Sequence, residues 1–248
     1  MHRIILLVFL FSIIYGDVMY EMETKTDGMM GLGDEVMTFR NFIKFDRMRT
    51  EVKIGNSESK GEAFIAIIRL DKGVSWILNP ENKEYIEMPL SEKLESSIID
   101  SSNVMPEFKI EKLEETKEIL KIKCEKYFVS VDINSGDEKM EITQTMWMGK
   151  DFPGYDEIKE FNDKVLGRVN ETGLVDIDNK LLKDLQKRIS EIDGFPLEME
   201  INVKMEDNYT KTELKSSSVI KKLTTVPISD RVFEIPEGYN PVKTPNTD

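Results

Sequence analysis

The residue types that most often carry enzyme chemistry are scarce in this chain. Its 248 residues contain one histidine, His2, and one cysteine, Cys124. Nucleophilic sites of the Ser-His-Asp or Cys-His kind need a histidine base, and common zinc and non-haem iron sites need histidine ligands. His2 lies in an apolar N-terminal segment that reads as a removable signal peptide, so we expect no histidine in the exported chain. Any catalysis would have to rest on carboxylates, lysines or tyrosines.

The carboxylates with the most suggestive spacing are Glu198 and Glu200. Two residues apart on a strand, they would lie about 7 Å apart, which is loosely the spacing of a glycosidase carboxyl pair. They alternate with apolar residues, however, and that pattern is typical of a solvated strand face. The run Asp132 to Glu138 begins like a calcium loop but lacks the later acidic ligand, and a hairpin turn is the better interpretation. We therefore expect no catalytic residue, no metal site and no cofactor.

Cys124 falls on the apolar side of the alternating run Leu120 to Cys124. That position favours a buried, inert thiol over a reactive or intermolecular one. A chain with a single cysteine has no internal disulfide, so its hydrophobic core must hold the fold.

The segment from Phe195 to Glu206 is the clearest structural element. Its odd positions are apolar and its even positions after Pro196 are polar, which predicts one long strand with one apolar face. Similar patterns predict strands at 17–26, 35–46, 47–54, 64–70, 74–78, 84–88, 125–133, 138–148 and 209–225, and two pieces within 108–124 joined near 114–117. The continuous apolar run 64–70 predicts a strand covered on both faces, and the short connections predict antiparallel pairing.

Three helices are expected, at residues 89–99, 155–169 and 178–192. The last two carry apolar residues at helical spacing, so each needs an apolar surface to pack against. The glycine-rich run 27–34 holds Met29, Met30 and Leu32, and is either a flap over a pocket or a loop tip packed on its own protein. The pattern predicts one β-rich α+β domain in which helices cover a broad antiparallel sheet.

The N-terminus predicts export. Arg3 precedes the apolar run 4–15, which is too short to span a bilayer, and Gly16 offers a small residue at a cleavage site. We expect a signal peptide at 1–16, one domain at 17–240 and a flexible tail at 241–248, in a monomer that is periplasmic or extracellular; a retained anchor is the alternative. The formal net charge of −13 disfavours nucleic acid as a partner and gives no attraction to an anionic membrane.

Several short motifs resemble one group of proteins. They are spread in order along the chain: Asn82-Lys-Glu-Tyr-Ile-Glu-Met-Pro89, Lys123-Cys-Glu-Lys-Tyr127, Trp147-Met-Gly-Lys-Asp-Phe-Pro-Gly-Tyr155, Gly194-Phe-Pro-Leu197 and Phe233-Glu-Ile-Pro-Glu-Gly-Tyr239. With the apolar N-terminus, they resemble exported bacterial proteins of the lipoprotein-carrier type, including outer-membrane lipoprotein-sorting proteins and related domains of unknown function. The resemblance implies a curved antiparallel half-barrel whose concave face is closed by helices. In carrier members the resulting cavity holds acyl chains.

Two functions are weighed for such a chain. The first is non-catalytic binding of a lipid, an acyl chain or a lipoprotein in an apolar cavity between sheet and helices. Methionine supports it, because all but one of the 14 methionines follow the signal segment and thioethers adapt to varied acyl shapes. The predicted lining consists of Phe39, Trp76, Met146, Met148, Met199 and Ile201. The second function is an envelope structural or interaction protein with a solid core and no ligand.

Overall fold

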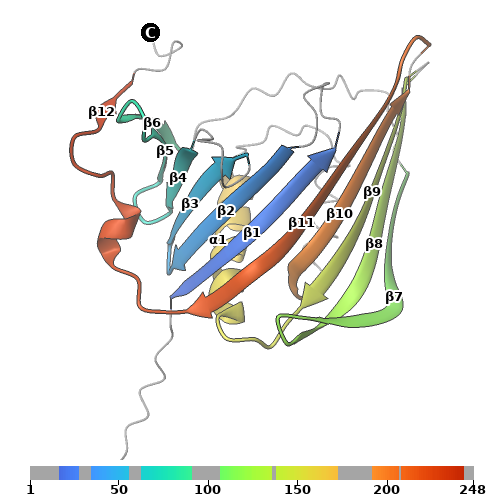
Figure 1. Ribbon diagram of the computed structural model, residues 1–248, viewed down its shortest axis with the longest axis horizontal. Helices are drawn as coiled ribbons and strands as arrows, with labels where there is room; N and C mark the ends of the chain where they lie inside the picture. Colours follow the sequence, from blue (N-terminus) through green and yellow to red (C-terminus); the bar gives the residue numbers. More distant parts are fainter. Residues whose placement is uncertain are drawn as a thin grey trace, which may run out of the picture.

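The computed structural model describes residues 17–27, 35–55, 63–90, 107–135, 138–172, 192–206 and 208–242. Strands make up most of this part of the chain (Figure 1). They are β1 (Val18–Asp27), β2 (Glu35–Lys44), β3 (Arg47–Ile54), β4 (Ala63–Arg69), β5 (Val74–Asn79), β6 (Glu84–Pro89), β7 (Glu107–Ile119), β8 (Ile122–Ser135), β9 (Glu138–Gly149), β10 (Phe195–Glu206), β11 (Lys211–Thr225) and β12 (Asn240–Pro241). One α-helix, α1 (Tyr155–Thr172), and one short 3₁₀ helix, η2 (Asp230–Phe233), complete the description.

All twelve described strands belong to one open sheet. Its order is β12-β6-β5-β4-β3-β2-β1-β11-β10-β9-β8-β7, so β7 and β12 are its two edges. Neighbouring strands are antiparallel throughout, except that the two residues of β12 pair with β6 in parallel. The first and last segments of the domain meet in the middle of the sheet, because β1 pairs with β11.

Bulges in the central strands help to bend this sheet. β10 has the bounds that its alternation predicts, and it shifts register against β9 between Pro196 and Glu198. β1 shifts register against β11 between Glu21 and Met22. An extra residue on one strand increases the local twist and bends that strand, which helps a sheet to curve without closing.

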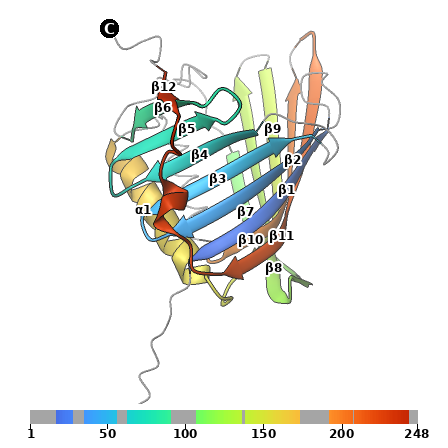
Figure 2. The same ribbon diagram turned by 60° about the vertical axis from the view of Figure 1, so that its left-hand side comes forward.

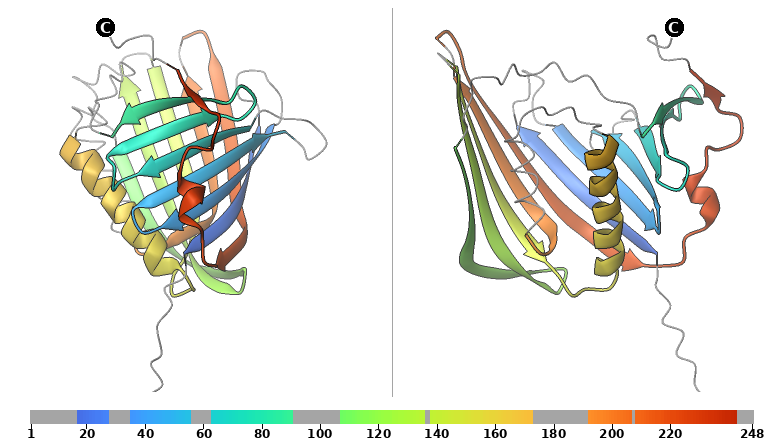
Figure 3. Two further views of the ribbon diagram at one scale, coloured as in Figure 1. Left: turned by 90° about the vertical axis from the view of Figure 1, so that its left-hand side faces the viewer. Right: turned by 180° about the vertical axis from the view of Figure 1, so that it is seen from behind.

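The helix α1 packs against the concave face of the sheet (Figure 3). Ile158 and Phe161 are almost fully buried there, among side chains that include Val18, Ile43 and Ile220. Asp156 and Glu157 lie in the first turn of the helix, where negative charge is favourable beside unpaired backbone N–H groups. The sequence predicted this helix and its role as a cover of the sheet.

The C-terminal strap, residues 226–242, crosses the opposite, convex face over β3 to β5 (Figure 2). Its Ile228 and Phe233 are buried against Ile67, Trp76 and Leu78. The apolar run predicted cover on both faces of β4, and this holds in part. Ile65 and Ile67 are buried under the strap, whereas on the other face Ile68 packs with the helix-side cluster and Phe64 is exposed. The strap ends beside β6, where the Val242 N–H donates to the Tyr85 carbonyl (2.8 Å).

These findings confirm an α+β fold built on a curved, open antiparallel sheet. Its covering by helices is established for α1 alone, because the predicted helix 178–192 and most of the predicted helix 89–99 lie outside the described residues. The predicted signal peptide and residues 243–248 of the predicted tail lie outside them too, whereas Pro241 pairs with Tyr85. In the part of the chain that is described, no helix is both long and apolar enough to cross a bilayer.

The prediction for residues 108–124 was wrong in one respect. The chain does not turn near 114–117; β7 continues through this region with a register shift against β8 between Lys112 and Thr116. The turn lies at Leu120 and Lys121, between the paired residues Ile119 and Ile122. This displacement creates the hairpin tip that borders the candidate site.

Candidate functional site

Five of the six predicted cavity residues share the concave face. Strand register places six residues in one row across the sheet, in the order Met37, Thr24, Ser218, Met199, Met146, Tyr127. The neighbouring row holds Ile201 between Ser216 and Gln144. Phe39 pairs with Met22, which contacts the cluster under α1, and Met148 lies two residues from Met146 on the same strand face.

The apolar floor of this face is partly buried and partly accessible. Met146 and Met148 are buried together with Val129, and Ile192 packs against them. Phe39, Met199 and Ile201 are only partly buried. The polar groups between them satisfy one another: the Thr24 and Ser218 hydroxyls are hydrogen-bonded at 2.8 Å, and the Gln144 amide donates to the Met199 sulfur at 3.6 Å.

Trp76 does not join the other five, and its assignment to the cavity was wrong. Register links Trp76 through Ile67 and Arg49 to Phe42, whose side chain lies opposite to those of its strand neighbours Asn41 and Ile43. Trp76 is buried under the strap, and its indole N–H donates to Glu87 at 2.7 Å. It belongs to the core of the convex face.

A cleft opens at one end of the concave face, where Met148 is one of its walls. This basal cleft has a volume of about 850 Å³ and is lined by residues 120–123, 125, 148, 150–153, 193 and 223–225. Its walls come from the β7–β8 tip, the loop after β9, Asp193 before β10, and the end of β11. In Figure 1 the β7–β8 hairpin bends beneath the lower ends of β9 and β10. The volume falls in the range of small-molecule sites, roughly 300–1,000 Å³.

Two of the three acidic groups in the basal cleft have partners. Asp193 accepts a hydrogen bond from the Tyr155 hydroxyl (2.7 Å) and forms an ion pair with Lys150 (3.3 Å). Both contacts lower the pKa of Asp193. Burial, together with this hydrogen bond, raises the pKa of Tyr155 to about 12. Glu125 is paired with Lys112 at 2.6 Å, and the hydrogen bond from Lys112 lowers the pKa of Glu125.

Two lysines of the basal cleft are not paired in this way. Lys121 and Lys123 line it and are exposed, and within the described part of the chain neither makes an ion pair or a side-chain hydrogen bond. Asp151 is the one acid of the lining left without such a partner among the described residues. The cleft therefore combines an apolar wall of Ile122, Met148 and Phe152 with two available ammonium groups.

The hairpin tip beside these lysines has an unusual backbone. Leu120 (φ 52°) and Lys121 (φ 64°) both adopt the left-handed conformation, as a two-residue type I′ turn requires. Asparagine and glycine are the usual occupants, because a side chain such as leucine or lysine is disfavoured there. Leu120 is also 43% exposed, and it is the one exposed leucine among the residues whose side chains are described. The tip thus holds an apolar side chain and an ammonium group in a conformation that neither residue favours.

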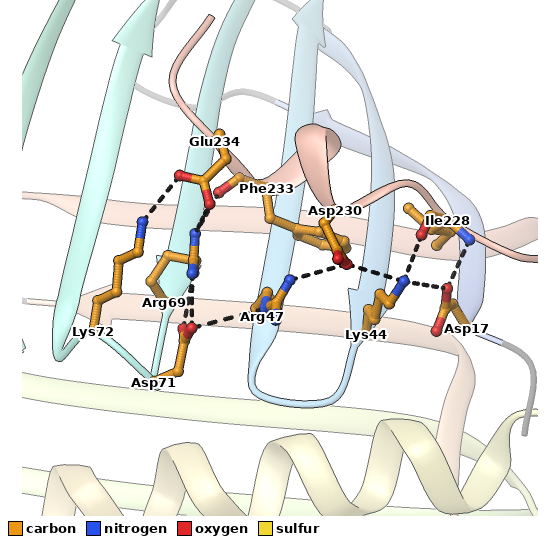
Figure 4. Close-up of polar contacts among 10 residues, drawn as sticks. All are labelled: Asp17, Lys44, Arg47, Arg69, Asp71, Lys72, Ile228, Asp230, Phe233 and Glu234. Atoms are coloured by element: carbon orange, nitrogen blue, oxygen red, sulfur yellow. Dashed lines mark hydrogen bonds and ion pairs between the residues drawn. The ribbon is translucent and has the colours of Figure 1, made fainter.

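The densest group of charges lies elsewhere, under the strap (Figure 4). Lys44 contacts Asp17 and Asp230, Arg47 contacts Asp230 and Asp71, and Lys72 contacts Glu234. Arg69 is nearly buried; it forms paired hydrogen bonds with Asp71, contacts Glu234 and donates to the Phe233 carbonyl. This network of mutually paired charges fastens the strap to β2, β3 and β4, and it includes Asp17 just before β1.

The residues that the sequence offered for chemistry, Glu198 and Cys124, make structural contacts. Glu198 forms an ion pair with Lys117 (2.6 Å) on the face opposite Met146, and Lys117 also lies 4.2 Å from the Trp147 ring centre. Cys124 is buried as predicted, and burial raises the pKa of its thiol. Among the described residues, no three His, Cys, Asp or Glu side chains are grouped so as to hold a metal ion.

Comparison with known proteins identifies the family. Residues 21–239 match DUF4412, a domain of unknown function. The chain belongs to this family. DUF4412 residues thus include β2 to β11, α1 and most of β1 and of the strap. None of the curated proteins matches the chain.

Two solved structures were found to be similar to this DUF4412 chain. One, from Vibrio parahaemolyticus, is described as an outer membrane lipoprotein-sorting protein domain; it is 9% identical, with a TM-score of 0.31, over 88% of this chain and 89% of that one. The other is a DUF1329 family protein from Desulfovibrio piger, 11% identical, with a TM-score of 0.34, over 89% of this chain and 90% of that one.

Sequence reasoning missed most of the basal cleft. It named Met148 but not Lys121, Lys123 or Phe152, because it placed the turn near 114–117 and left 120–124 inside a strand. The one available signal was Leu120 to Lys123, where lysines alternate with apolar residues at the end of a long charged strand. Since Leu-Lys is not a turn sequence, that signal did not mark a hairpin tip.

Proposed function

We propose that this DUF4412 protein is a non-catalytic, exported binding protein that holds a lipid or the acyl chain of a lipid-modified partner. The site is the basal cleft together with the adjoining concave face. A single observation carries the proposal: the cleft has a volume of about 850 Å³, and its lining includes Met148, which packs with Met146 and Val129 in one buried cluster. An acyl chain lying along Met148 would gain from removing its methylenes from water, about 0.8 kcal/mol for each one fully buried.

The composition of the walls supports binding rather than reaction. Methionine, leucine, isoleucine and phenylalanine side chains supply apolar contact, and the ionisable groups of the walls are lysines, carboxylates and no histidine. The carboxylates Glu125 and Asp193 are held as ions by Lys112, Lys150 and Tyr155, which makes them poor general acids near neutral pH. Export rests on the apolar segment 4–15, and we place the protein in the periplasm or outside the cell.

The test is native mass spectrometry of the protein purified after export from its own host, followed by organic extraction of whatever is bound. Co-purified phospholipid, fatty acid or acylated peptide near one per chain is the expected result. A clean apo mass, with no uptake of added phospholipid or fatty acid, would overturn the proposal. As a site control, Met148→Gln places an amide in the cleft wall and should lower the occupancy, whereas Met88→Gln on β6 should not.

A ligand-free envelope interaction protein is the second candidate. The observation in its favour is the filled packing under α1 and under the strap, where Phe161 and Phe233 are fully buried. That candidate predicts the apo mass, so the same experiment separates the two.

A further inference from the structure

Along the concave face of β8, the side chains change from charged to apolar. Lys123 and Glu125 alternate onto the same face as Tyr127 and Val129, and Lys121 precedes them in the tip. Glu125 pairs with Met148 and Tyr127 with Met146, so the charged end of this row borders the cleft and its inner end borders the methionine floor. The row therefore runs from exposed ammonium groups to buried thioethers.

We propose that the ligand is an anionic amphiphile whose carboxylate or phosphate head binds Lys121 and Lys123, and whose chain runs from there toward Met148. This inference rests on the proposed function and adds the charge of the ligand and its orientation. A carboxylate or phosphate next to the first methylene would accept charge-assisted hydrogen bonds from both ammonium groups. The adjacent methylenes would then meet Ile122 and Met148, which line the same cleft.

The charge balance of the cleft favours an anionic head over a cationic one. Lys150 is engaged by Asp193, and Glu125 by Lys112, so these groups largely neutralise one another. With Lys112 counted against Glu125, although Lys112 lies outside the lining, Lys121, Lys123 and Asp151 leave an excess of one positive charge. Lys123 also helps to lower the pKa of Glu125, so Lys121 is the more available of the two lysines. Every arginine or lysine drawn under the strap in Figure 4 has a carboxylate partner, so the basic groups of that region are not available to a ligand in the way that Lys121 is.

The backbone conformation of the β7–β8 tip also supports a role in ligand binding. The turn keeps Leu120 and Lys121 in left-handed conformations, although asparagine and glycine would fit that turn with less strain. Strained conformations of this kind are enriched where a side chain has to be held for recognition. Here the held side chains are the exposed Leu120, which can cover the first methylenes of a chain, and Lys121, which can reach its head.

The experiment compares four twelve-carbon probes on the exported protein, each below its critical micelle concentration, by isothermal titration calorimetry. The probes are laurate, dodecyl phosphate, dodecanol and dodecyltrimethylammonium; acetate and inorganic phosphate report head binding without a chain. We expect laurate and dodecyl phosphate to bind about tenfold more tightly than dodecanol, and the cationic probe most weakly. If laurate binds better than dodecyl phosphate, the head is a carboxylate; the reverse order assigns a phosphate.

The variant Lys121→Glu/Lys123→Glu should reduce laurate affinity at least about tenfold and leave dodecanol affinity within about twofold. Lys53→Glu/Lys139→Glu is the matched control, because it makes the same change of net charge at two exposed lysines that do not line the cleft. Equal binding of laurate and dodecanol, or equal effects of the two double variants, would overturn the anionic head while leaving the proposed function standing. Absence of binding by all four probes would overturn the proposed function as well.

Discussion

Two regions of this molecule place basic side chains beside apolar ones, and they treat the charges in opposite ways. Under the strap, Lys44, Arg47, Arg69 and Lys72 each contact a carboxylate, and the apolar residues beneath are sealed around Phe233. At the basal cleft, Lys121 and Lys123 form no ion pair within the described chain, and the cleft is open to solvent beside an apolar wall in which Ile122 is partly exposed and Met148 and Phe152 are buried. Basic groups that are paired with carboxylates fasten the strap to the sheet. Basic groups without such partners, beside an apolar cleft, are suited to binding a ligand.

The largest change in stability is expected from a substitution in the apolar cluster under the strap. Phe233→Ala removes the fully buried ring at the centre of the strap cluster, and large-to-small changes of this kind cost about 3–5 kcal/mol of unfolding free energy. Urea denaturation followed by circular dichroism measures it. Phe45→Ala is the control, because Phe45 is 61% exposed and should lose less than about 1 kcal/mol. Similar losses for both variants would mean that the strap does not stabilise the sheet.

Arg69→Met should have the next largest effect. The guanidinium is nearly buried and holds Asp71, Glu234 and the Phe233 carbonyl together. We expect a loss of about 2 kcal/mol, below the 3–5 kcal/mol of a fully buried pair, because both carboxylates reach solvent. Binding of laurate at the distant cleft should be unchanged. If Arg69→Met is as stable as the parent protein, the ion pairs do not stabilise the strap, and the packing of Phe233 alone holds it.

The same network predicts acid sensitivity. The hydrogen bond from Arg69 lowers the pKa of Asp71. Burial raises the pKa of Glu234, but the hydrogen bonds from Lys72 and Arg69 outweigh burial, so the pKa of Glu234 is lowered overall. Because the unfolded chain then binds more protons than the folded one, this stability is present above about pH 4.5 and is lost as the pH falls through the folded pKa values. Unfolding free energies measured from pH 7 to pH 3 should show the loss, and Arg69→Met should show less of it.

At the β7–β8 turn beside the basal cleft, a substitution is expected to give a small gain in stability. Leu120→Asn/Lys121→Gly supplies the residues that a type I′ turn prefers and should add about 1 kcal/mol of stability. Because the same change removes one of the two unpaired ammonium groups, laurate affinity should fall. A gain in stability with unchanged laurate affinity would limit the turn to a structural role and contradict its part in recognition.

Much of the sheet could be predicted because strand alternation is a local property. The odd and even positions of Phe195–Glu206 predicted the bounds of β10. The continuous apolar run 64–70 predicted a strand covered on both faces, and β4 is buried on its strap face and partly covered on the other. The hairpin at Asp132 to Glu138 was likewise predicted, and β8 and β9 pair across it. These predictions needed no knowledge of what lies above or below the sheet.

The cavity lining could be predicted only in part, because alternation says which residues share a face and not which face is concave. Trp76 alternates with Ser75 and Ile77 as a lining residue would, yet the strap covers its face, and residues 226–242 carry no local sign of where they pack. The basal cleft depends on a turn at Leu120 and Lys121, whose residue types do not mark a turn. Both features arise from contacts distant in sequence.

The central claim is that an acyl chain binds at Met148, and methyl-resolved NMR tests it most directly. The exported protein, labelled at the methionine ε-methyl groups, is titrated with laurate below its critical micelle concentration, and each signal is assigned by single Met→Leu variants. We expect the Met148 signal to shift in a saturable manner, with smaller shifts at its neighbour Met146, while the signal of Met88 on β6 stays in place. An unmoved Met148 signal, or equal shifts at every methionine, would contradict this account.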